Sequence, residues 1–217
     1  MKPLSKFFNS LLVDVNPLAS NRCIEFPFLS SQECDDIIKY ACDKKQSFSI
    51  SDVELNNDVY TRDQVTTANF FKYNFFSDHP DYIDRFIGVL KKSLPWLVYP
   101  IAVQAWVNIY NTGEGIKWHI HDGLNSHSYT INIFVGGETK PGTSYMEPGS
   151  TVTTIENKLG GMIISNCSLW HMVTPNESKI TRYSIGITIH DYEAITQKIL
   201  KGVSFNTSSQ GVILLTD

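Results

Sequence analysis

The segment YNTGEGIKWHIHDG (residues 110–123) contains two of the six histidines in this chain of 217 residues. Residues two positions apart on a β-strand project to the same side, so we expect His119 and His121 to share one face. Trp118 and Ile120 would then face away from them. A single histidine is more often a hydrogen-bonded core or surface side chain, but two imidazoles that point into the same space favour a metal site.

A third imidazole is available further along the chain, in the segment SNCSLWHMVTP (residues 165–175). His171 lies 50 residues after His121, a separation that lets a late strand return beside an early one in an antiparallel barrel. Three nitrogen or oxygen ligands on one face, with further positions open, are typical of non-haem iron(II) sites. The sequence therefore predicts a site formed by His119, His121 and His171.

Strands with two different faces surround these histidines in the sequence. From residue 99 onward, short alternating segments are separated by turns that contain glycine, proline or asparagine, as in an antiparallel all-β region. The clearest segments are IAVQAWVNIY (101–110), TINIFV (130–135) and RYSIGITI (182–189). Their polar or small faces carry Gln104, Trp106, Asn108, Tyr110, Thr130, Asn132, Phe134, Arg182, Ser184, Gly186 and Thr188. These faces either line the pocket of a small barrel or jelly roll, or form the solvated surface of a sandwich.

Helices are predicted before this β-region. PFLSSQECDDIIKYACDKK (27–45) has Ser30 or Ser31 as an N-cap, acidic residues in its first turn and lysines in its last. HPDYIDRFIGVLKKSL (79–94) is entered through a proline and closes before another. Residues 49–76 mix β-branched and aromatic residues with polar turns, which indicates short strands and a surface loop.

One domain is the default for a chain of this length. We expect an N-terminal support of helices and strands (1–95), a β-core (96–190) and a C-terminal extension (191–217). The extension would contain a short helix over 192–201 and a closing strand near 211–215.

Composition argues against several classes of protein. The net charge is −4, and no run of lysine and arginine is longer than two, so the chain has no electrostatic footprint for nucleic acid. No apolar run is long enough to span a bilayer, and the N-terminus lacks a signal-peptide pattern, so we expect a soluble, cytoplasmic protein. Four cysteines without C-x-x-C spacing favour reduced, mostly buried thiols, and Cys34 and Cys42 are assigned to core packing rather than to a redox pair.

Arg182 is a candidate anion-binding residue. It lies 11 residues after His171, and Ser184 shares its strand face. A guanidinium fork beside a hydroxyl is well suited to hold a carboxylate. The alternative is a structural ion pair with an aspartate or glutamate, since a buried arginine needs an anionic partner.

Together these motifs resemble the iron(II)/2-oxoglutarate-dependent oxygenases, particularly the prolyl-hydroxylase-like branch and its phage or bacterial relatives. The resemblance covers about residues 96–190, and the segment PFLSSQECDDIIKYA is similar to the opening helix of that superfamily. The motifs are Tyr110-x-x-Gly113, Trp118-His119-x-His121-Asp122, Gly160-Gly161, His171 and Arg182-x-Ser184. The resemblance implies a mainly β fold with flanking helices, built on a double-stranded β-helix of the jelly-roll or cupin-like type.

The resemblance also implies the metal ligands. In the family, a His-x-Asp or His-x-Glu pair and a distal histidine bind iron(II), which places His119 at the first ligand and His171 at the distal one. This chain departs from the family at the carboxylate position, which is His121, with Asp122 one residue later. Either three histidines form the site, or a kink swings Asp122 onto the metal; strand parity favours His121. In the first case Asp122 would orient a histidine through its ring N–H.

By the same resemblance, Arg182 and Ser184 bind the far carboxylate of the cosubstrate 2-oxoglutarate, and Tyr110 and Thr130 contact it. The alternatives are aromatic packing for Tyr110 and strand propensity for Thr130. Asn132 faces the same expected pocket. The expected activity is a dioxygenase that hydroxylates a C–H bond of an unidentified peptide or small molecule and converts 2-oxoglutarate to succinate; ascorbate is a candidate reductant. Candidate substrate contacts in the two long loops are Tyr60, Arg62, Tyr145 and Glu147. His127 is assigned to an exposed loop, and His79 and His190 receive no function.

Other classes remain open at this stage. A cupin-like metalloenzyme would use the same three histidines without 2-oxoglutarate, and a non-catalytic β-barrel module would bind no redox-active metal. A serine or cysteine hydrolase is disfavoured because the chain lacks the corresponding motifs. The aromatic residues Phe70, Phe71, Phe75 and Phe76 belong either to the core or to the surface of a homodimer.

Overall fold

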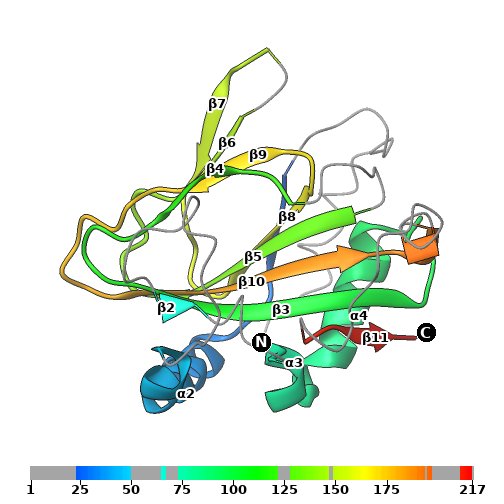
Figure 1. Ribbon diagram of the computed structural model, residues 1–217, viewed down its shortest axis with the longest axis horizontal. Helices are drawn as coiled ribbons and strands as arrows, with labels where there is room; N and C mark the ends of the chain where they lie inside the picture. Colours follow the sequence, from blue (N-terminus) through cyan, green and yellow to red (C-terminus); the bar gives the residue numbers. More distant parts are fainter. Residues whose placement is uncertain are drawn as a thin grey trace, which may run out of the picture.

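Two antiparallel sheets face each other in the computed structural model (Figure 1). The structure describes residues 23–49, 65–66, 73–121, 128–146, 149–193, 195–196 and 211–216. The four-stranded sheet lies above the larger sheet in Figure 1, and the helices α2 (Ser31–Ser49) and α3 (Phe75–Asp78) lie below the larger one. In this part of the chain, no helix combines the length and the apolarity needed to cross a membrane.

The larger, major sheet has seven strands in the order β1-β8-β5-β10-β3-β11, with β2 also paired to β3. Its strands are β1 (Ile24–Pro27), β2 (Val65–Thr66), β3 (Ile101–Tyr110), β5 (Ser128–Gly136), β8 (Gly161–Asn166), β10 (Arg182–His190) and β11 (Ile213–Leu215). The long central strand β10 pairs along its whole length with β3, from Arg182 opposite Tyr110 to His190 opposite Ala102. The closing strand predicted near residues 211–215 is therefore confirmed as β11.

The smaller, minor sheet has the order β4-β9-β6-β7. Its strands are β4 (Ile116–His119), β6 (Thr143–Met146), β7 (Val152–Ile155) and β9 (Trp170–Val173). From β3 to β10 the chain passes back and forth between the sheets. Strands β3, β5, β8 and β10 lie in the major sheet, and β4, the β6–β7 hairpin and β9 lie in the minor sheet, which is the winding of a double-stranded β-helix. The predicted jelly-roll core with flanking helices is confirmed.

Helices cover the outer face of the major sheet. They are α2 (Ser31–Ser49), α3 (Phe75–Asp78), the 3-10 turn η1 (Pro80–Tyr82) and α4 (Ile83–Ser93). Strand residues such as Ile109, Ile133 and Ile187 are fully buried beneath them and belong to one hydrophobic cluster with Phe86 of α4. Burying one such side chain contributes about 1.5–3 kcal/mol. The apolar strand faces read from the sequence are therefore the core.

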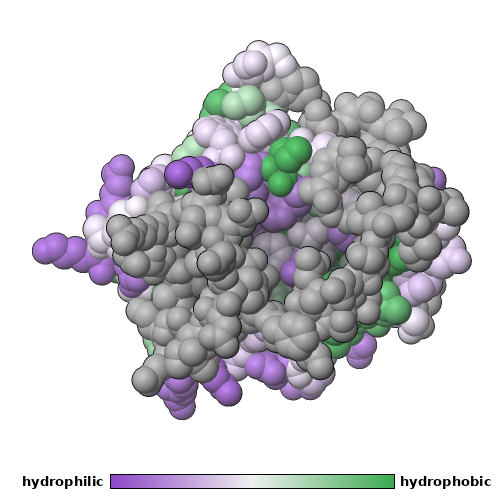
Figure 2. All heavy atoms as spheres, viewed as in Figure 1, coloured by the Kyte–Doolittle hydropathy of each residue, from purple (hydrophilic) through white to green (hydrophobic). Residues whose placement is uncertain are grey.

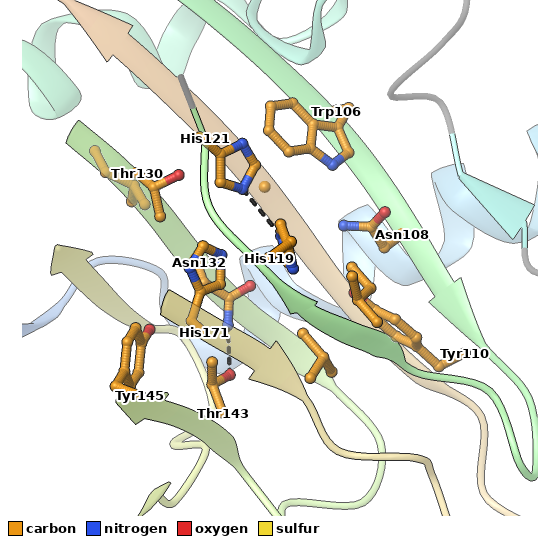
Figure 3. A pocket seen from close by; sticks show the side chains of 14 residues that line it. Trp106, Asn108, Tyr110, His119, His121, Thr130, Asn132, Thr143, Tyr145 and His171 are labelled. Atoms are coloured by element: carbon orange, nitrogen blue, oxygen red, sulfur yellow. Dashed lines mark hydrogen bonds between the residues drawn. The ribbon is translucent and has the colours of Figure 1, made fainter. Parts of the chain in front are cut away.

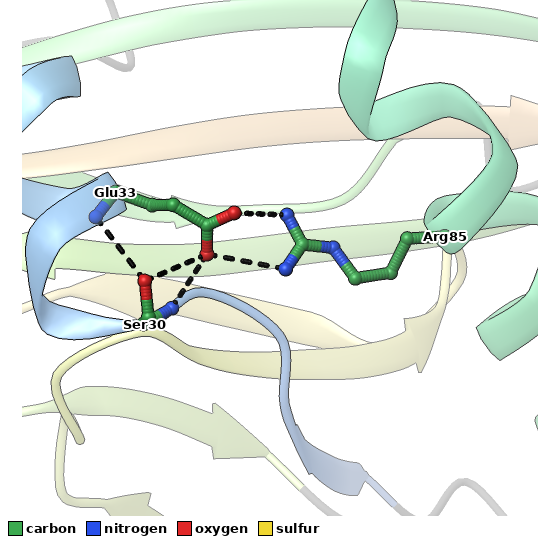
Figure 4. A network of polar contacts seen from close by, with 3 residues as sticks. All are labelled: Ser30, Glu33 and Arg85. Atoms are coloured by element: carbon green, nitrogen blue, oxygen red, sulfur yellow. Dashed lines mark hydrogen bonds and ion pairs between the residues drawn. The ribbon is translucent and has the colours of Figure 1, made fainter.

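Ser30 caps helix α2 (Figure 4). The Ser30 N–H donates to Glu33 Oε2 at 2.8 Å, and the Glu33 N–H donates to Ser30 Oγ at 3.3 Å, which forms a capping box. Arg85 of α4 donates two hydrogen bonds to the same carboxylate, at 2.7 and 3.1 Å. These bonds from Arg85 are the main reason that the pKa of Glu33 falls to about 2. The network joins the two predicted helices to each other.

Two local predictions are corrected by the structure. Helix α2 continues to Ser49, so no lysine lies in its last turn. Phe75 and Phe76 lie in helix α3 rather than in a strand or loop, because Asn74 caps it by accepting a hydrogen bond from the Phe76 N–H at 3.0 Å. Both phenylalanines are buried, which agrees with the core position considered for them, whereas Phe70 and Phe71 lie outside the described residues.

Cys42 is exposed, whereas Cys34 is buried in the core as expected. The sulfur of Cys42 lies 3.3 Å from the hydroxyl of Tyr183. Helix periodicity rotates Cys42 from the position of the buried Ala41 to the edge of the buried face of α2, where it is exposed but still reaches Tyr183 of β10. In the C-terminal extension, residues 192–193 and 195–196 are helical, and the rest of the helix predicted there lies outside the described residues.

Candidate metal and carboxylate site

Strand pairing in the minor sheet brings two of the predicted ligands together. His119 at the end of β4 is the cross-strand partner of His171 in β9. In each ring, Nδ1 lies near a backbone carbonyl two residues earlier: Lys117 O at 2.7 Å and Leu169 O at 2.9 Å. A carbonyl oxygen only accepts, so Nδ1 carries the proton and Nε2 keeps a free lone pair. Both imidazoles are thus held in the tautomer that presents Nε2 to a metal.

His121 completes a cluster of three histidines (Figure 3). Strand β4 ends at His119, so His121 lies beyond the strand that was expected to contain it, and its N–H donates to the carbonyl of Cys167 at 3.0 Å. Parity nevertheless holds, because the Nε2 atoms of His119 and His121 are 3.2 Å apart. One ligand nitrogen from each of the three rings lies within 4.8 Å of the others.

The donor set fits a single metal ion. Imidazole nitrogens lie about 2.0–2.1 Å from zinc, so two ligands of one ion are separated by roughly 3 Å. The distance between the Nε2 atoms of His119 and His121 has this value, and the ring of His171 stacks on that of His121 with centroids 5.1 Å apart. The three rings converge from two strand ends and leave the pocket side open. That is the arrangement of a site with exchangeable positions.

Burial keeps these imidazoles neutral. Loss of solvent is the main cause that lowers the pKa of all three: His119 below its ordinary value, His121 well below it, and His171 to about 4. The neighbouring histidines add to the effect at His121 and His171. At neutral pH the lone pairs are therefore available to a metal without prior loss of a proton.

A pocket lies between the two sheets, in front of the histidines. It is lined by Trp106, Asn108, Tyr110, Ile116, His119, His121, Thr130, Ile131, Asn132, Thr143, Tyr145, His171, Val173 and Gly186. The polar strand faces read from the sequence thus line a pocket and do not form a solvated surface, with predicted residues Tyr110, Thr130 and Asn132 in its wall. Figure 2 shows hydrophilic side chains in the middle of the viewed face, between the two sheets.

Arg182 lies next to this pocket without being among its lining residues. It is the cross-strand partner of Tyr110, is only 1% exposed, and has its guanidinium carbon 5.9 Å from the Tyr110 ring. Nη1 donates to Thr174 O at 2.9 Å, but Nε and Nη2 have no hydrogen-bond partner among the described residues, and neither has Ser184 Oγ. Burial lowers the pKa of Arg182.

The unmade hydrogen bonds at Arg182 and Ser184 point to an anion. A buried polar group without a partner costs about 1–3 kcal/mol, and more if it is charged. No described carboxylate forms an ion pair with Arg182, so the structural salt bridge considered above is not found in this part of the chain. Two guanidinium nitrogens and a hydroxyl on one strand face are suited to a carboxylate.

Sequence reasoning missed part of the pocket wall. Tyr145 was expected in a loop but lies in β6, opposite His171, where burial raises its pKa well above the ordinary value. Trp106 shares the polar face of β3 with Tyr110, so its alternation position was a usable signal.

Residues Tyr60, Arg62, Asp122, His127 and Glu147 lie outside the described part of the chain. His79 and His190 are not pocket residues; His79 stacks on Phe75 and His190 bonds to Ser128.

The fold is shared with solved prolyl hydroxylases. A prolyl-4-hydroxylase from Pseudomonas putida has a TM-score of 0.59 over 81% of this chain and 96% of that chain, at 10% identity. The collagen prolyl hydroxylase of Paramecium Bursaria Chlorella virus-1, solved with 2-oxoglutarate, has a TM-score of 0.57 over 82% and 99%, at 17% identity. A Trichoplax adhaerens prolyl hydroxylase, solved with a peptide of hypoxia inducible factor, reaches 0.65 over 89% and 94%, also at 17%.

At such low identity the likeness to these prolyl hydroxylases establishes the fold alone. The sequence itself matches no protein-family model and no curated protein. The function therefore has to be argued from the site.

Proposed function

We propose that this chain is a single-domain iron(II)/2-oxoglutarate-dependent dioxygenase that hydroxylates a C–H bond of a peptide or small molecule. One observation carries the proposal: Arg182 and Ser184 hold three buried polar atoms that have no partner among the described residues, beside a pocket that contains three convergent histidines. A metal site alone requires no buried guanidinium nearby. A cosubstrate with one end on a metal and a carboxylate at the other accounts for both features.

In this proposal each residue has a separate task. The Nε2 atoms of His119, His121 and His171 hold the iron(II), and backbone carbonyls fix the tautomers of His119 and His171. Arg182 and Ser184 bind the far carboxylate of 2-oxoglutarate, and Tyr110, Thr130 and Asn132 position the rest of it. When bound, iron(II) supplies the redox chemistry that couples conversion of 2-oxoglutarate and dioxygen to succinate and carbon dioxide with substrate hydroxylation.

Three neutral imidazoles leave the full charge of the ion in the pocket, because no carboxylate ligand offsets it. This favours an anionic cosubstrate, which meets a positive charge at the metal end and another at Arg182. Asp122 then acts outside the ligand set, as an acceptor for a ring N–H. In the alternative ligand set Asp122 replaces His121. Single mutations of these two residues distinguish it from the three-histidine set.

The test is an anaerobic titration of metal-free protein with iron(II) and then with 2-oxoglutarate, followed by visible charge-transfer absorbance. We expect a band in the wild type that disappears in His121→Ala and survives in Asp122→Ala. Arg182→Ala should weaken the response to 2-oxoglutarate while iron(II) still binds. Arg85→Ala removes an equal charge from the helix-covered side and is the matched control.

The other outcomes separate the alternatives. Loss of the band in Asp122→Ala with retention in His121→Ala would assign the carboxylate as ligand. Iron binding without any band would favour a cupin-like three-histidine metalloenzyme that does not use 2-oxoglutarate, a reading that the neutral donor set also suits. Failure to bind iron(II) would leave a non-catalytic binding module.

A further inference from the structure

The indole of Trp106 is a buried hydrogen-bond donor that the proposed chemistry does not use. The side chain lines the pocket and is 7% exposed, and its Nε1 has no hydrogen-bond partner among the described residues. Figure 3 shows the indole beside His121, with its nitrogen on the side that faces Asn108. A buried N–H of this kind is retained at a cost in stability unless a ligand accepts from it.

The position of this indole is fixed by Gly186. A Cβ built on Gly186 would lie 2.5 Å from Cε2, 2.7 Å from Cζ2 and 2.7 Å from Nε1 of Trp106. Gly186 is also the cross-strand partner of Trp106 in the β10–β3 pair. The ring therefore lies directly against the backbone of β10, where only glycine leaves room for it. Such packing holds the N–H in one direction before any ligand arrives.

Trp106 is at the metal end of the pocket and not at the carboxylate end. Its ring centroid is 5.9 Å from that of His121. The Arg182–Tyr110 pair lies four residues along the same two strands from the Gly186–Trp106 pair, which is roughly 13 Å at 3.3 Å per residue. A cosubstrate anchored at Arg182 thus approaches the histidines along β3 from the Tyr110 end, while the indole lies beside His121 at the metal end.

The electrostatics of the pocket restrict what that substrate is. Its lining residues in the described part of the chain include no aspartate, glutamate, lysine or arginine. Among these described residues a cationic group would find no carboxylate partner, and the metal charge would repel it. A neutral group with an oxygen acceptor meets the Trp106 N–H without that penalty.

We propose that Trp106 determines substrate specificity by donating its Nε1–H to a neutral oxygen acceptor, such as an amide carbonyl, close to the carbon that is oxidised. The inference rests on the proposed function because it takes the histidine end of the pocket as the place of reaction. It names a substrate class: uncharged, amide-like groups rather than ammonium groups or plain hydrocarbons.

The test observes the indole directly by NMR in the full chain, labelled with ¹⁵N-tryptophan, loaded with zinc(II) and saturated with 2-oxoglutarate. The chain has four tryptophans, and the Trp106 resonance is the one missing in Trp106→Phe. The probes are 2-pyrrolidinone, a neutral cyclic amide; pyrrolidinium, a cation of similar shape; and cyclopentane, which has no acceptor. Of these three probes, we expect only 2-pyrrolidinone to cause a saturable downfield shift of the Trp106 N–H proton.

Variants keep the result interpretable. By ligand-observed NMR, Trp106→Phe should weaken 2-pyrrolidinone binding about five- to tenfold and leave cyclopentane binding unchanged. Gly186→Ala should displace the indole and abolish the shift, whereas Gly88→Ala, whose new Cβ would meet nothing within 4 Å, should retain it.

Three results overturn the inference: no Trp106 shift with 2-pyrrolidinone, an equal shift with pyrrolidinium, or a hydrogen-bond shift already produced by 2-oxoglutarate alone. Failure of the proposed function has a different signature, since 2-oxoglutarate binding would then not depend on Arg182. If that dependence is intact and the probe leaves Trp106 unshifted, only the specificity inference fails.

Discussion

The two faces of the major sheet are built from the same strands but carry different kinds of side chain, apolar on one face and mostly polar or small on the other. On β10, Ile185, Ile187 and Ile189 face the helices and are fully buried in the hydrophobic cluster. The alternate residues face the minor sheet, where Arg182 and Ser184 keep polar atoms that have no partner in the part of the chain that the structure describes. The helix-covered face stabilises the fold by apolar burial, whereas the pocket face holds groups that lower stability unless something binds to them.

The largest expected effect on stability comes from a substitution on the helix-covered face. Ile187→Ala removes a fully buried side chain between Ile131 and Ala105 and should lower the free energy of unfolding by about 2–5 kcal/mol. Urea unfolding of the metal-free protein measures this. Below the unfolding transition the variant should still bind 2-oxoglutarate in the presence of iron(II), because the side chain does not reach the pocket. Loss of binding in the folded variant would contradict a division of labour between the faces.

On the pocket face, replacing a buried side chain should weaken 2-oxoglutarate binding without lowering stability. Arg182→Met removes a buried charge whose Nε and Nη2 have no partner, so we expect unchanged or increased stability in urea. Binding of 2-oxoglutarate, followed by the charge-transfer band, should weaken by about 100-fold because a charged hydrogen-bonded pair is lost. Arg85→Met is the matched control, with little effect on binding. A stability loss in Arg182→Met as large as that of Ile187→Ala would show that Arg182 is a structural residue.

This contrast also explains what the sequence alone can predict. The convergence of His119 with His121 and the shared face of Arg182 and Ser184 follow from the two-residue period of a strand, which is local geometry. The early end of β4 before His121 depends on a register shift against β9, and the place of Tyr145 opposite His171 depends on pairing across the minor sheet. Such contacts between distant segments leave no periodic signal in the chain.

Local capping chemistry marks a similar limit. Ser30 was recognisable as an N-cap because its partner Glu33 is three residues away. Asn74 also caps a helix, but its side chain in addition donates to the carbonyls of Val103 and Gly211, far along the chain. Helix α3 was therefore missed, since these long-range bonds are what place Asn74 at that position.

The histidines of the pocket face predict a pH dependence of stability. Burial and the neighbouring His119 hold the folded pKa of His171 near 4, below its usual value of 6.5. Between these values the unfolded chain binds the proton and the folded chain does not, so stability is full above about pH 6.5 and falls as the pH drops toward 4. For metal-free protein we expect a loss of about 2–3 kcal/mol from this residue. Urea titrations at several pH values measure it, and His171→Gln should flatten the slope; an unchanged slope would exclude His171 as its source.

The smallest expected effect on stability comes from the network of Ser30, Glu33 and Arg85 on the helix-covered side. Arg85 lowers the pKa of Glu33 to about 2, so this network contributes above pH 4.5 and is lost below it, a range under that of His171. Because both side chains are partly exposed, Arg85→Ala should cost at most about 1 kcal/mol. Ser30→Ala should cost about 1 kcal/mol through the lost cap. Urea unfolding of the single and double variants gives their coupling, and neither should alter the charge-transfer band. A change in that band would mean that the two faces are coupled through the sheet, and the separation of stability from binding would have to be abandoned.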